Sequence, residues 1–175
     1  YLAEKRQEDK LTSMIDDISL KILKILQEKA RVPNSEVARQ VGMAPSGVLE
    51  RVRKLEKQGI IDGYEVRLNP ERFGRSLVGF VFVTTAPGAD EATLGKALAK
   101  IPDVQEVHYV AGEDGFMVKL RASDTAVLDR IRREKIASLP QVRSTRTLIA
   151  LSTFKETARI PLDDAAIQNL KRRRK

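Results

Sequence analysis

The sequence predicts an α+β protein in which a three-helix helix-turn-helix domain precedes a ferredoxin-like βαββαβ domain. Residues 14–63 hold three segments with apolar side chains at helical spacing, separated by short turns that contain polar residues or glycine. Residues 77–153 alternate β-rich and helical segments in the order strand, helix, strand, strand, helix, strand. This second order is that of the ferredoxin-like motif, in which two helices cover one face of an antiparallel sheet.

A basic amphipathic helix is predicted from Pro45 to the glycine stop at Gly59, since proline suits the first helical position and glycine the one just past the end. Its apolar stripe consists of Val48, Val52 and Leu55. The opposite side is polar and mostly cationic. It carries Ser46, Glu50, Arg51, Arg53, Lys54 and Lys57. Taken alone, this stretch fits a DNA recognition helix and a solvated surface helix equally well.

The two helices expected before it favour DNA binding. Asp17 is suited to cap a first helix whose apolar face includes Ile18, Ile22, Ile25 and Leu26. Asn34 or Ser35 is suited to cap a short second helix, which Gly42 ends a few residues before Pro45. Two helices joined by a glycine-containing turn of three or four residues form the helix-turn-helix motif. We therefore expect DNA binding rather than a structural helical hairpin.

Within this motif, the expected DNA contacts differ by position. Ser46, Gly47 and Glu50 lie at the start of the recognition helix, where side chains come nearest to base edges. Arg39 and Lys57 are better placed for phosphates. A second group, Arg51, Arg53 and Lys54, is assigned to DNA without a choice between bases and phosphates.

Three further segments flank the two domains. Residues 1–13 are expected to form a flexible or helical extension, since their charges balance and they offer little to bury. Residues 64–76 are expected to form a linker strand and loop, because 64–68 alternate as a strand does after the turn pair Asp62-Gly63. Residues 154–175 form a tail whose basic end either adds non-specific affinity for DNA or is a disordered solubilising end; Asp163 is suited to cap a short helix there.

The first and last predicted strands indicate self-association. A half-exposed antiparallel strand should alternate apolar and polar residues, yet residues 77–83 and 148–151 are apolar on both faces. Two helices bury only one face of the sheet, so the other needs a partner surface, and we expect a homodimer. Such a dimer would present two recognition helices about 34 Å apart to successive turns of DNA. The alternative is that the tail covers this face with Phe154, Ile160, Leu162 and Ile167.

Composition argues against several classes of protein. The formal net charge of +8 and pI of about 9.8 suit a polyanionic partner, and half of that excess lies in the tail. With no cysteine and one histidine, His108, disulfides and thiolate or multi-histidine metal sites are impossible. No phosphate loop or nucleophile elbow occurs, so we expect neither an enzyme nor a cofactor. No apolar run approaches the ~20 residues of a membrane helix, and a cytoplasmic location without a membrane partner is expected.

Four stretches occur in a specific order: residues 17–31, then SEVARQVGM, then RVRKLEKQGII, then LNPERFG. Together they resemble the Lrp/AsnC, or feast/famine, family of bacterial and archaeal transcription regulators, and the resemblance extends to about Ser152. It implies a ferredoxin-like effector domain that dimerises and often binds a small molecule, commonly an amino acid. It also implies that the linker strand pairs with that of a second subunit, and that dimers assemble into tetramers or octamers.

The resemblance also assigns an effector site, with two departures. The turn Gly112, Glu113, Asp114, Gly115 corresponds to a family turn that ends in an aspartate, which helps to hold the amino group of a bound amino acid. Here Gly115 stands in that place, so a plain glycine-rich β-turn is an equal alternative. Thr147 matches another position near the family's ligand site. Ala44 replaces the serine that usually caps the recognition helix, at a cost of ~1 kcal/mol.

The expected function is therefore sequence-specific DNA binding by an oligomeric transcription regulator whose sheet domain senses a metabolite. The alternative is a metabolite-binding or assembly module whose helical domain serves protein contacts. Salt-sensitive, sequence-preferring binding to duplex DNA would separate the two.

Overall fold

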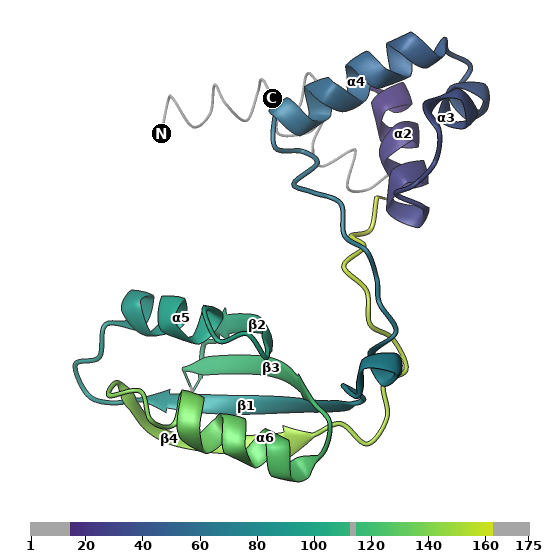
Figure 1. The fold of residues 1–175 in the computed structure, drawn as a ribbon. Helices are drawn as coiled ribbons and strands as arrows, with labels where there is room; N and C mark the ends of the chain where they lie inside the picture. The colour runs from purple at the N-terminus through teal and green to yellow at the C-terminus, as the bar shows by residue number, and fades with distance from the viewer. Residues whose placement is uncertain (1–14, 113–114, 163–175) are drawn as a thin grey trace. The chain divides into compact units, whose positions relative to one another are not determined.

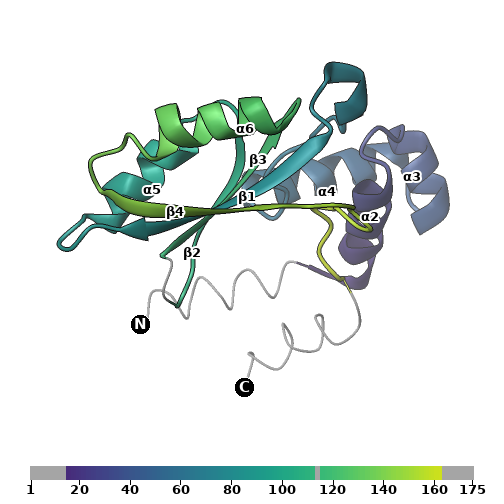
Figure 2. The same ribbon diagram turned by 90° about the horizontal axis from the view of Figure 1, so that it is seen from below.

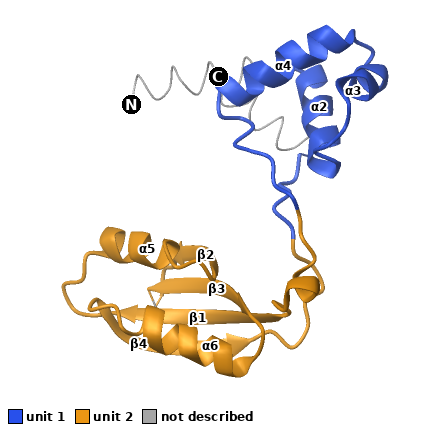
Figure 3. Cartoon of the chain, viewed as in Figure 1, with its two compact units in different colours: residues 1–66, 157–175 blue, residues 67–156 orange. Residues whose placement is uncertain are grey.

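The computed structural model describes residues 15–112 and 115–162 and divides the chain into two compact units (Figure 3). The helical unit comprises residues 1–66 and 157–175, and the sheet unit comprises residues 67–156. The chain thus passes between the units twice, once in the linker and once near the start of the tail. The expected extension over residues 1–13 and the expected helix capped by Asp163 lie outside the described residues. Among the described helices, none is long and apolar enough to cross a membrane.

The described part of the helical unit contains three helices: α2 (Asp17–Glu28), α3 (Asn34–Val41) and α4 (Pro45–Lys57) (Figure 1). Their apolar stripes meet in a core whose buried members include Ile22, Val37 and Val48. Gly42 ends α3 with a φ of 72°, in the left-handed region that glycine enters without strain. The expected helix-turn-helix arrangement is confirmed.

Two predicted caps are wrong by one residue or more. Asp16, rather than Asp17, caps α2, because its carboxylate accepts a hydrogen bond of 2.7 Å from the backbone N–H of Ser19. Neither Asn34 nor Ser35 caps α3, since Pro33 is the N-cap and both residues already lie inside the first turn. Helix α4 starts at Pro45 after Ala44 without a side-chain cap, so Ser46 does not replace the missing serine.

The expected strand over residues 64–68 is wrong for the single chain. Residues 62–69 have no regular secondary structure, because no described strand lies beside them to share a backbone ladder. Val66 and Leu68 are 85% and 61% exposed, although both are apolar. A short 3₁₀ helix, η1 (Pro70–Phe73), then leads into the sheet unit.

The sheet unit has the predicted βαββαβ order. Its strands are β1 (Leu77–Thr85), β2 (Val104–Tyr109), β3 (Phe116–Ala122) and β4 (Val142–Ile149), all antiparallel to their neighbours in the order β2-β3-β1-β4. Asp90 and Asp124 cap α5 (Glu91–Ala99) and α6 (Thr125–Ile131) as predicted. Both helices lie on one face of the sheet (Figure 2). We call the other face the open face.

The second half of the sheet unit differs from prediction in detail. The helix expected to reach Leu139 ends as an α-helix at Ile131 and continues as a π-helical turn over Arg132–Ile136. The last strand ends at Ile149 rather than at Ser152. Under the helices, the core includes Val81, Leu94, Leu98, Val118 and Ile136, all fully buried. Gly79 belongs to this packing, since a Cβ there would lie 2.7 Å from the side chain of Leu128.

Candidate nucleic-acid interface and effector site

The outer face of α4 is a cationic surface supported by the core beneath it. Val48 and Leu55 are buried, which fixes the rotation of the helix and turns the polar stripe outward. That stripe is exposed along its length. Its exposed members are Ser46, Glu50, Arg53, Lys54 and Lys57. In the described part of the chain, Arg53, Lys54 and Lys57 have no side-chain hydrogen bond or ion pair. Their charges are therefore available to a polyanion.

Arg51 differs from its neighbours on α4 because it points into the unit. Its Nη1 donates to both carboxylate oxygens of Asp16, at 2.7 and 2.9 Å, and to Oγ of Ser19 at 3.0 Å. The guanidinium thus joins α4 to the start of α2, and its side chain is 31% exposed. Burial raises the pKa of Asp16, but the hydrogen bonds from Ser19 and Arg51 lower it by more, so that its net pKa is below the ordinary value of 3.8. The geometry supports a positioning role for Arg51.

Two other residues expected at the interface are less free than the sequence implies. Arg39 is exposed on α3, but its guanidinium forms a two-point ion pair with Glu36. The hydrogen bonds from Arg39 hold the pKa of Glu36 at about 2. Gly47 is half-buried, and a Cβ there would lie 3.1 Å from the end of the Met43 side chain. The absence of a side chain at Gly47 therefore serves packing as well as access to the start of α4.

We expect Arg51→Ala and Asp16→Asn to weaken DNA binding to a similar, small extent. Asparagine caps a helix as well as aspartate does, so Asp16→Asn removes the ion pair and leaves the cap and the Arg51 cation in place. Each change should destabilise the helical unit by no more than about 1 kcal/mol, since the pair is partly exposed. The contribution of Asp16, whose pKa is lowered in the folded state, is present above pH 3.8 and is lost as pH falls through its folded value.

Thermal unfolding and duplex-DNA titration of the two variants check this prediction. If Arg51 contacts DNA directly, Arg51→Ala alone will lose the ~1–3 kcal/mol of a base or phosphate contact, and the positioning role is contradicted.

The turn between β2 and β3 has a geometry that depends on glycine. Gly112 and Gly115 have φ values of 143° and 91°, and the N–H of Val110 donates to the carbonyl of Gly115 at 2.7 Å. A Cβ at Gly115 would lie 3.2 Å from the carbonyl oxygen of Val83, a backbone atom that cannot move aside cheaply. An aspartate at this position is therefore strained in this conformation. Glu113 and Asp114 lie outside the described residues.

Thr147 is not brought to this turn. It lies on β4 opposite Val81, so β1 stands between it and β3. Cross-strand partners share a face, which places Thr147 on the helix-covered side of the sheet. Its Oγ is buried and has no hydrogen-bond partner among the described residues.

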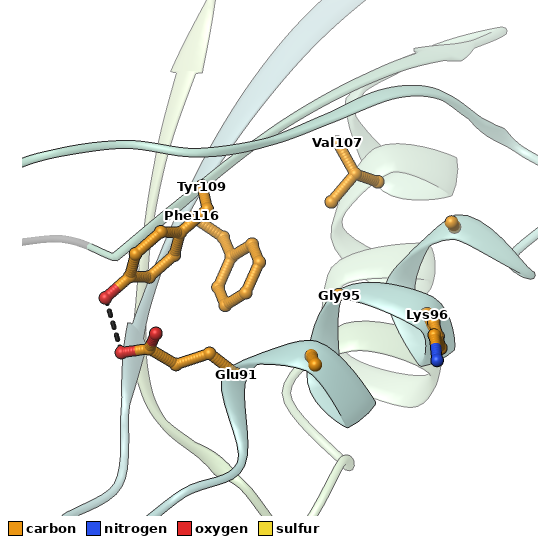
Figure 4. Close-up of a pocket in the computed structure, with 8 residues that line it drawn as sticks. Glu91, Gly95, Lys96, Val107, Tyr109 and Phe116 are labelled. Atoms are coloured by element: carbon orange, nitrogen blue, oxygen red, sulfur yellow. Dashed lines mark hydrogen bonds between the residues drawn. The ribbon is translucent and has the colours of Figure 1, made fainter. Parts of the chain in front are cut away.

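A groove that sequence reasoning missed runs beside the turn, between α5 and the strands β2 and β3 (Figure 4). Its volume is about 530 Å³, and its lining is mostly apolar. The lining residues are Glu91, Ala92, Gly95, Lys96, Ala99, Val107, Tyr109 and Phe116. The Tyr109 hydroxyl donates to the carboxylate of Glu91, and this bond raises the pKa of Tyr109. Tyr109 and Phe116 flank the turn in sequence, so the groove adjoins it.

One sequence feature of this groove, the glycine at position 95, is too weak a signal to predict the groove from sequence alone. Gly95 lies inside a helix, where glycine is unfavourable, and a Cβ there would lie 3.2 Å from the Phe116 ring. A glycine inside a helix can mark such a close approach, but the ring that approaches lies on another element.

Comparison with known proteins identifies both units. Residues 15–62 match the winged helix-turn-helix DNA-binding model, and residues 78–160 match the Lrp/AsnC ligand binding domain. The chain is 36% identical over 148 residues to the leucine-responsive regulatory protein of Escherichia coli strain K12, a match that covers 83% of this chain and 90% of that protein. The chain belongs to the Lrp/AsnC family. It is accordingly a helix-turn-helix transcription regulator rather than an enzyme.

Solved Lrp/AsnC structures share the fold over nearly their whole length. A transcriptional regulator from Neisseria meningitidis, solved as an L-Met complex, has a TM-score of 0.81 and 26% identity, and the match covers 86% of this chain and 99% of that one. A feast or famine regulatory protein from M. tuberculosis, complexed with L-methionine, has a TM-score of 0.77 and 32% identity, with 83% and 97% covered. Both matches span the helical and the sheet unit.

Proposed function

We propose that this Lrp/AsnC protein binds a specific duplex-DNA site as a homodimer through Ser46, Glu50, Arg53, Lys54 and Lys57 of α4. The observation that supports this proposal most directly is the exposed cationic stripe on the second helix of a helix-turn-helix, where Arg53, Lys54 and Lys57 have no ion-pair partner among the described residues. The cations would neutralise phosphates, while the first turn of α4 would reach base edges. Because a regulator acts where the chromosome lies, the proposal includes a cytoplasmic location.

The homodimer is proposed from the open face. Register places Phe80, Phe82, Met117 and Leu148 on this face, with Arg146 stacked 4.4 Å from the centre of the Phe82 ring. Leu148 is 48% exposed, and the phenylalanines are only half-buried. A partner surface would bury this apolar patch, and a second copy of the chain supplies the same patch by two-fold symmetry.

We expect Phe82→Glu to weaken the dimer by more than about tenfold, because it replaces an apolar ring with a carboxylate that must lose water when the interface forms. Ala99→Glu adds the same charge at an exposed position on the helix-covered side and serves as the control. Sedimentation velocity across a concentration series checks the prediction. Equal dimer dissociation constants for Phe82→Glu and the control would show that the dimer interface does not lie on the open face.

For the effector, we propose an α-amino acid with an apolar side chain, held in the groove beside the β2–β3 turn. The groove offers apolar walls for the side chain and the Glu91 carboxylate for the ammonium group. Glu91 would thereby supply the negative charge that Gly115 does not. The relatives from N. meningitidis and M. tuberculosis, which were solved with methionine, support this ligand class.

Calorimetric titration with L-methionine and L-leucine tests the effector proposal. Glu91→Gln should weaken binding by about tenfold or more, since it removes a charged hydrogen-bond acceptor. Glu134→Gln, the same change at another exposed position of the sheet unit, should leave binding unaltered. Binding that survives Glu91→Gln would contradict the groove as the site of the ammonium group.

A further inference from the structure

Helix α4 has two halves of different chemistry. Its exposed cations Arg53, Lys54 and Lys57 all lie in the second half. Residues 45–50 contain no cation, and Glu50 adds an exposed carboxylate to this first half. Phosphates attract the cations and repel the carboxylate, and the first residues of a recognition helix lie nearest to base edges. In the proposed complex, the first half of α4 therefore faces bases and the second half faces phosphates.

Leu49 is an apolar residue exposed in this first half. It is 36% exposed, whereas Val48 and Leu55 are buried in the helical unit. Among the described α-helices of both units, no other large apolar residue is exposed. The packing of the helical unit therefore does not account for a leucine at this position.

The place of Leu49 on the helix puts it beside the outward stripe. Ser46 lies three residues earlier and Arg53 four residues later, and residues at these separations are neighbours on a helix surface. Both neighbours are exposed. Long side chains on a helix lean toward its N-terminus, so Leu49 covers the surface next to Ser46 in the first turn. Leu49 thus borders the part of α4 that is expected to lie nearest to the bases.

The DNA major groove offers this side chain one well-matched group, the C5-methyl of thymine. The other groups that the base edges present there are hydrogen-bond donors and acceptors, with which an aliphatic side chain forms no bond. Contact with a thymine methyl removes apolar surface of both partners from water, which is favourable. A base-facing leucine therefore fits thymine better than it fits cytosine, adenine or guanine.

We infer that Leu49 is a specificity residue that recognises one thymine in each half-site by contact with its C5-methyl group. The inference rests on the proposed binding of duplex DNA through α4. It goes further by naming the base that one side chain selects and the atom by which it does so. A protein surface that covers Leu49 instead would leave DNA affinity indifferent to that methyl group.

The first test removes the methyl group and nothing else. In the duplex that the wild type enriches from a random library, uracil replaces thymine at one position at a time, and fluorescence anisotropy measures the affinity. At one thymine of each half-site, uracil should lower the affinity of the wild type by about fourfold, the value of one buried methyl group. Leu49→Ala should bind the thymine and uracil duplexes equally at that position. Thymine-to-uracil ratios that are the same for Leu49→Ala and the wild type at every position would overturn the inference.

Lys57→Ala is the matched control, because it shortens another exposed side chain of the same helix. It should weaken binding to all duplexes and keep the fourfold preference for thymine, since a phosphate contact carries no base information. Alanine favours the helix at least as well as leucine or lysine does, so both variants should stay folded. Circular dichroism checks this. Loss of the thymine preference in Lys57→Ala as well would show a general effect on α4 and overturn the inference.

The second test returns the methyl group on a different base. At the thymine position found in the first test, a C·G pair replaces the T·A pair, with the cytosine either unmodified or methylated at C5. The wild type should bind the methylated duplex about fourfold more tightly, and Leu49→Ala should bind both equally. Equal binding of both duplexes by the wild type would overturn the inference. Failure of the wild type to enrich any duplex would instead refute the proposed DNA binding, on which the inference rests.

Discussion

Replacing Arg53 and Lys54 together by glutamate should lower affinity for the preferred duplex by at least about a hundredfold and flatten its salt dependence. Both side chains are exposed on α4, and neither has a partner among the described residues, so the fold should not depend on them. The change removes two cations and places two carboxylates against the phosphate backbone. Fluorescence anisotropy titrations at two salt concentrations, with circular dichroism as a check on folding, measure the effect.

The matched control is the double change Arg130→Glu and Arg143→Glu in the sheet unit. Both positions are exposed, and the net charge of the protein changes by the same amount. An equal loss of affinity in this control would show that binding follows total charge rather than the surface of α4.

Ile22→Ala should unfold the helical unit selectively. Ile22 is fully buried between α2, α3 and α4, and loss of such a side chain costs about 2–5 kcal/mol. The two units have separate cores, so the sheet unit should keep its own transition and its self-association. Differential scanning calorimetry should show the transition of the helical unit moved to lower temperature and the transition of the sheet unit unchanged.

Leu94→Ala is the reciprocal change, because Leu94 is fully buried in the core of the sheet unit. Leu94→Ala should move the transition of the sheet unit to lower temperature and leave that of the helical unit unchanged. If either substitution shifts both transitions equally, the units fold as one cooperative body, and the division into independent domains is wrong.

Local sequence signals predicted most of the fold because each depends on a few adjacent residues. Pro45 and Gly59 bracket α4, and Asp90 and Asp124 cap their helices through bonds to residues two or three positions away. The linker strand was mispredicted for the opposite reason. Residues 64–68 alternate as a strand does, but a strand also needs a neighbour, and the described residues of the single chain provide none.

In the candidate sites, too, features that depend on nearby residues could be predicted, and features that join distant residues could not. The cationic stripe of α4 could be predicted from helical spacing, since the apolar stripe decides which side faces outward. The partner of Arg51 could not, because Asp16 lies 35 residues earlier and is joined to it only by the packing of α2 against α4. The groove at Glu91 likewise combines residues of α5, β2 and β3 that are far apart in sequence.

Selection of bound sequences from a random duplex-DNA library by the wild-type protein is the most direct test of the central claim. We predict enrichment of a roughly palindromic site whose two half-sites lie one or more helical turns apart, ~10 base pairs each. The enriched pool should be lost in the Arg53→Glu and Lys54→Glu double variant and should weaken as salt is raised. A pool without an enriched sequence, the same for wild type and variant, would contradict sequence-specific DNA binding through α4.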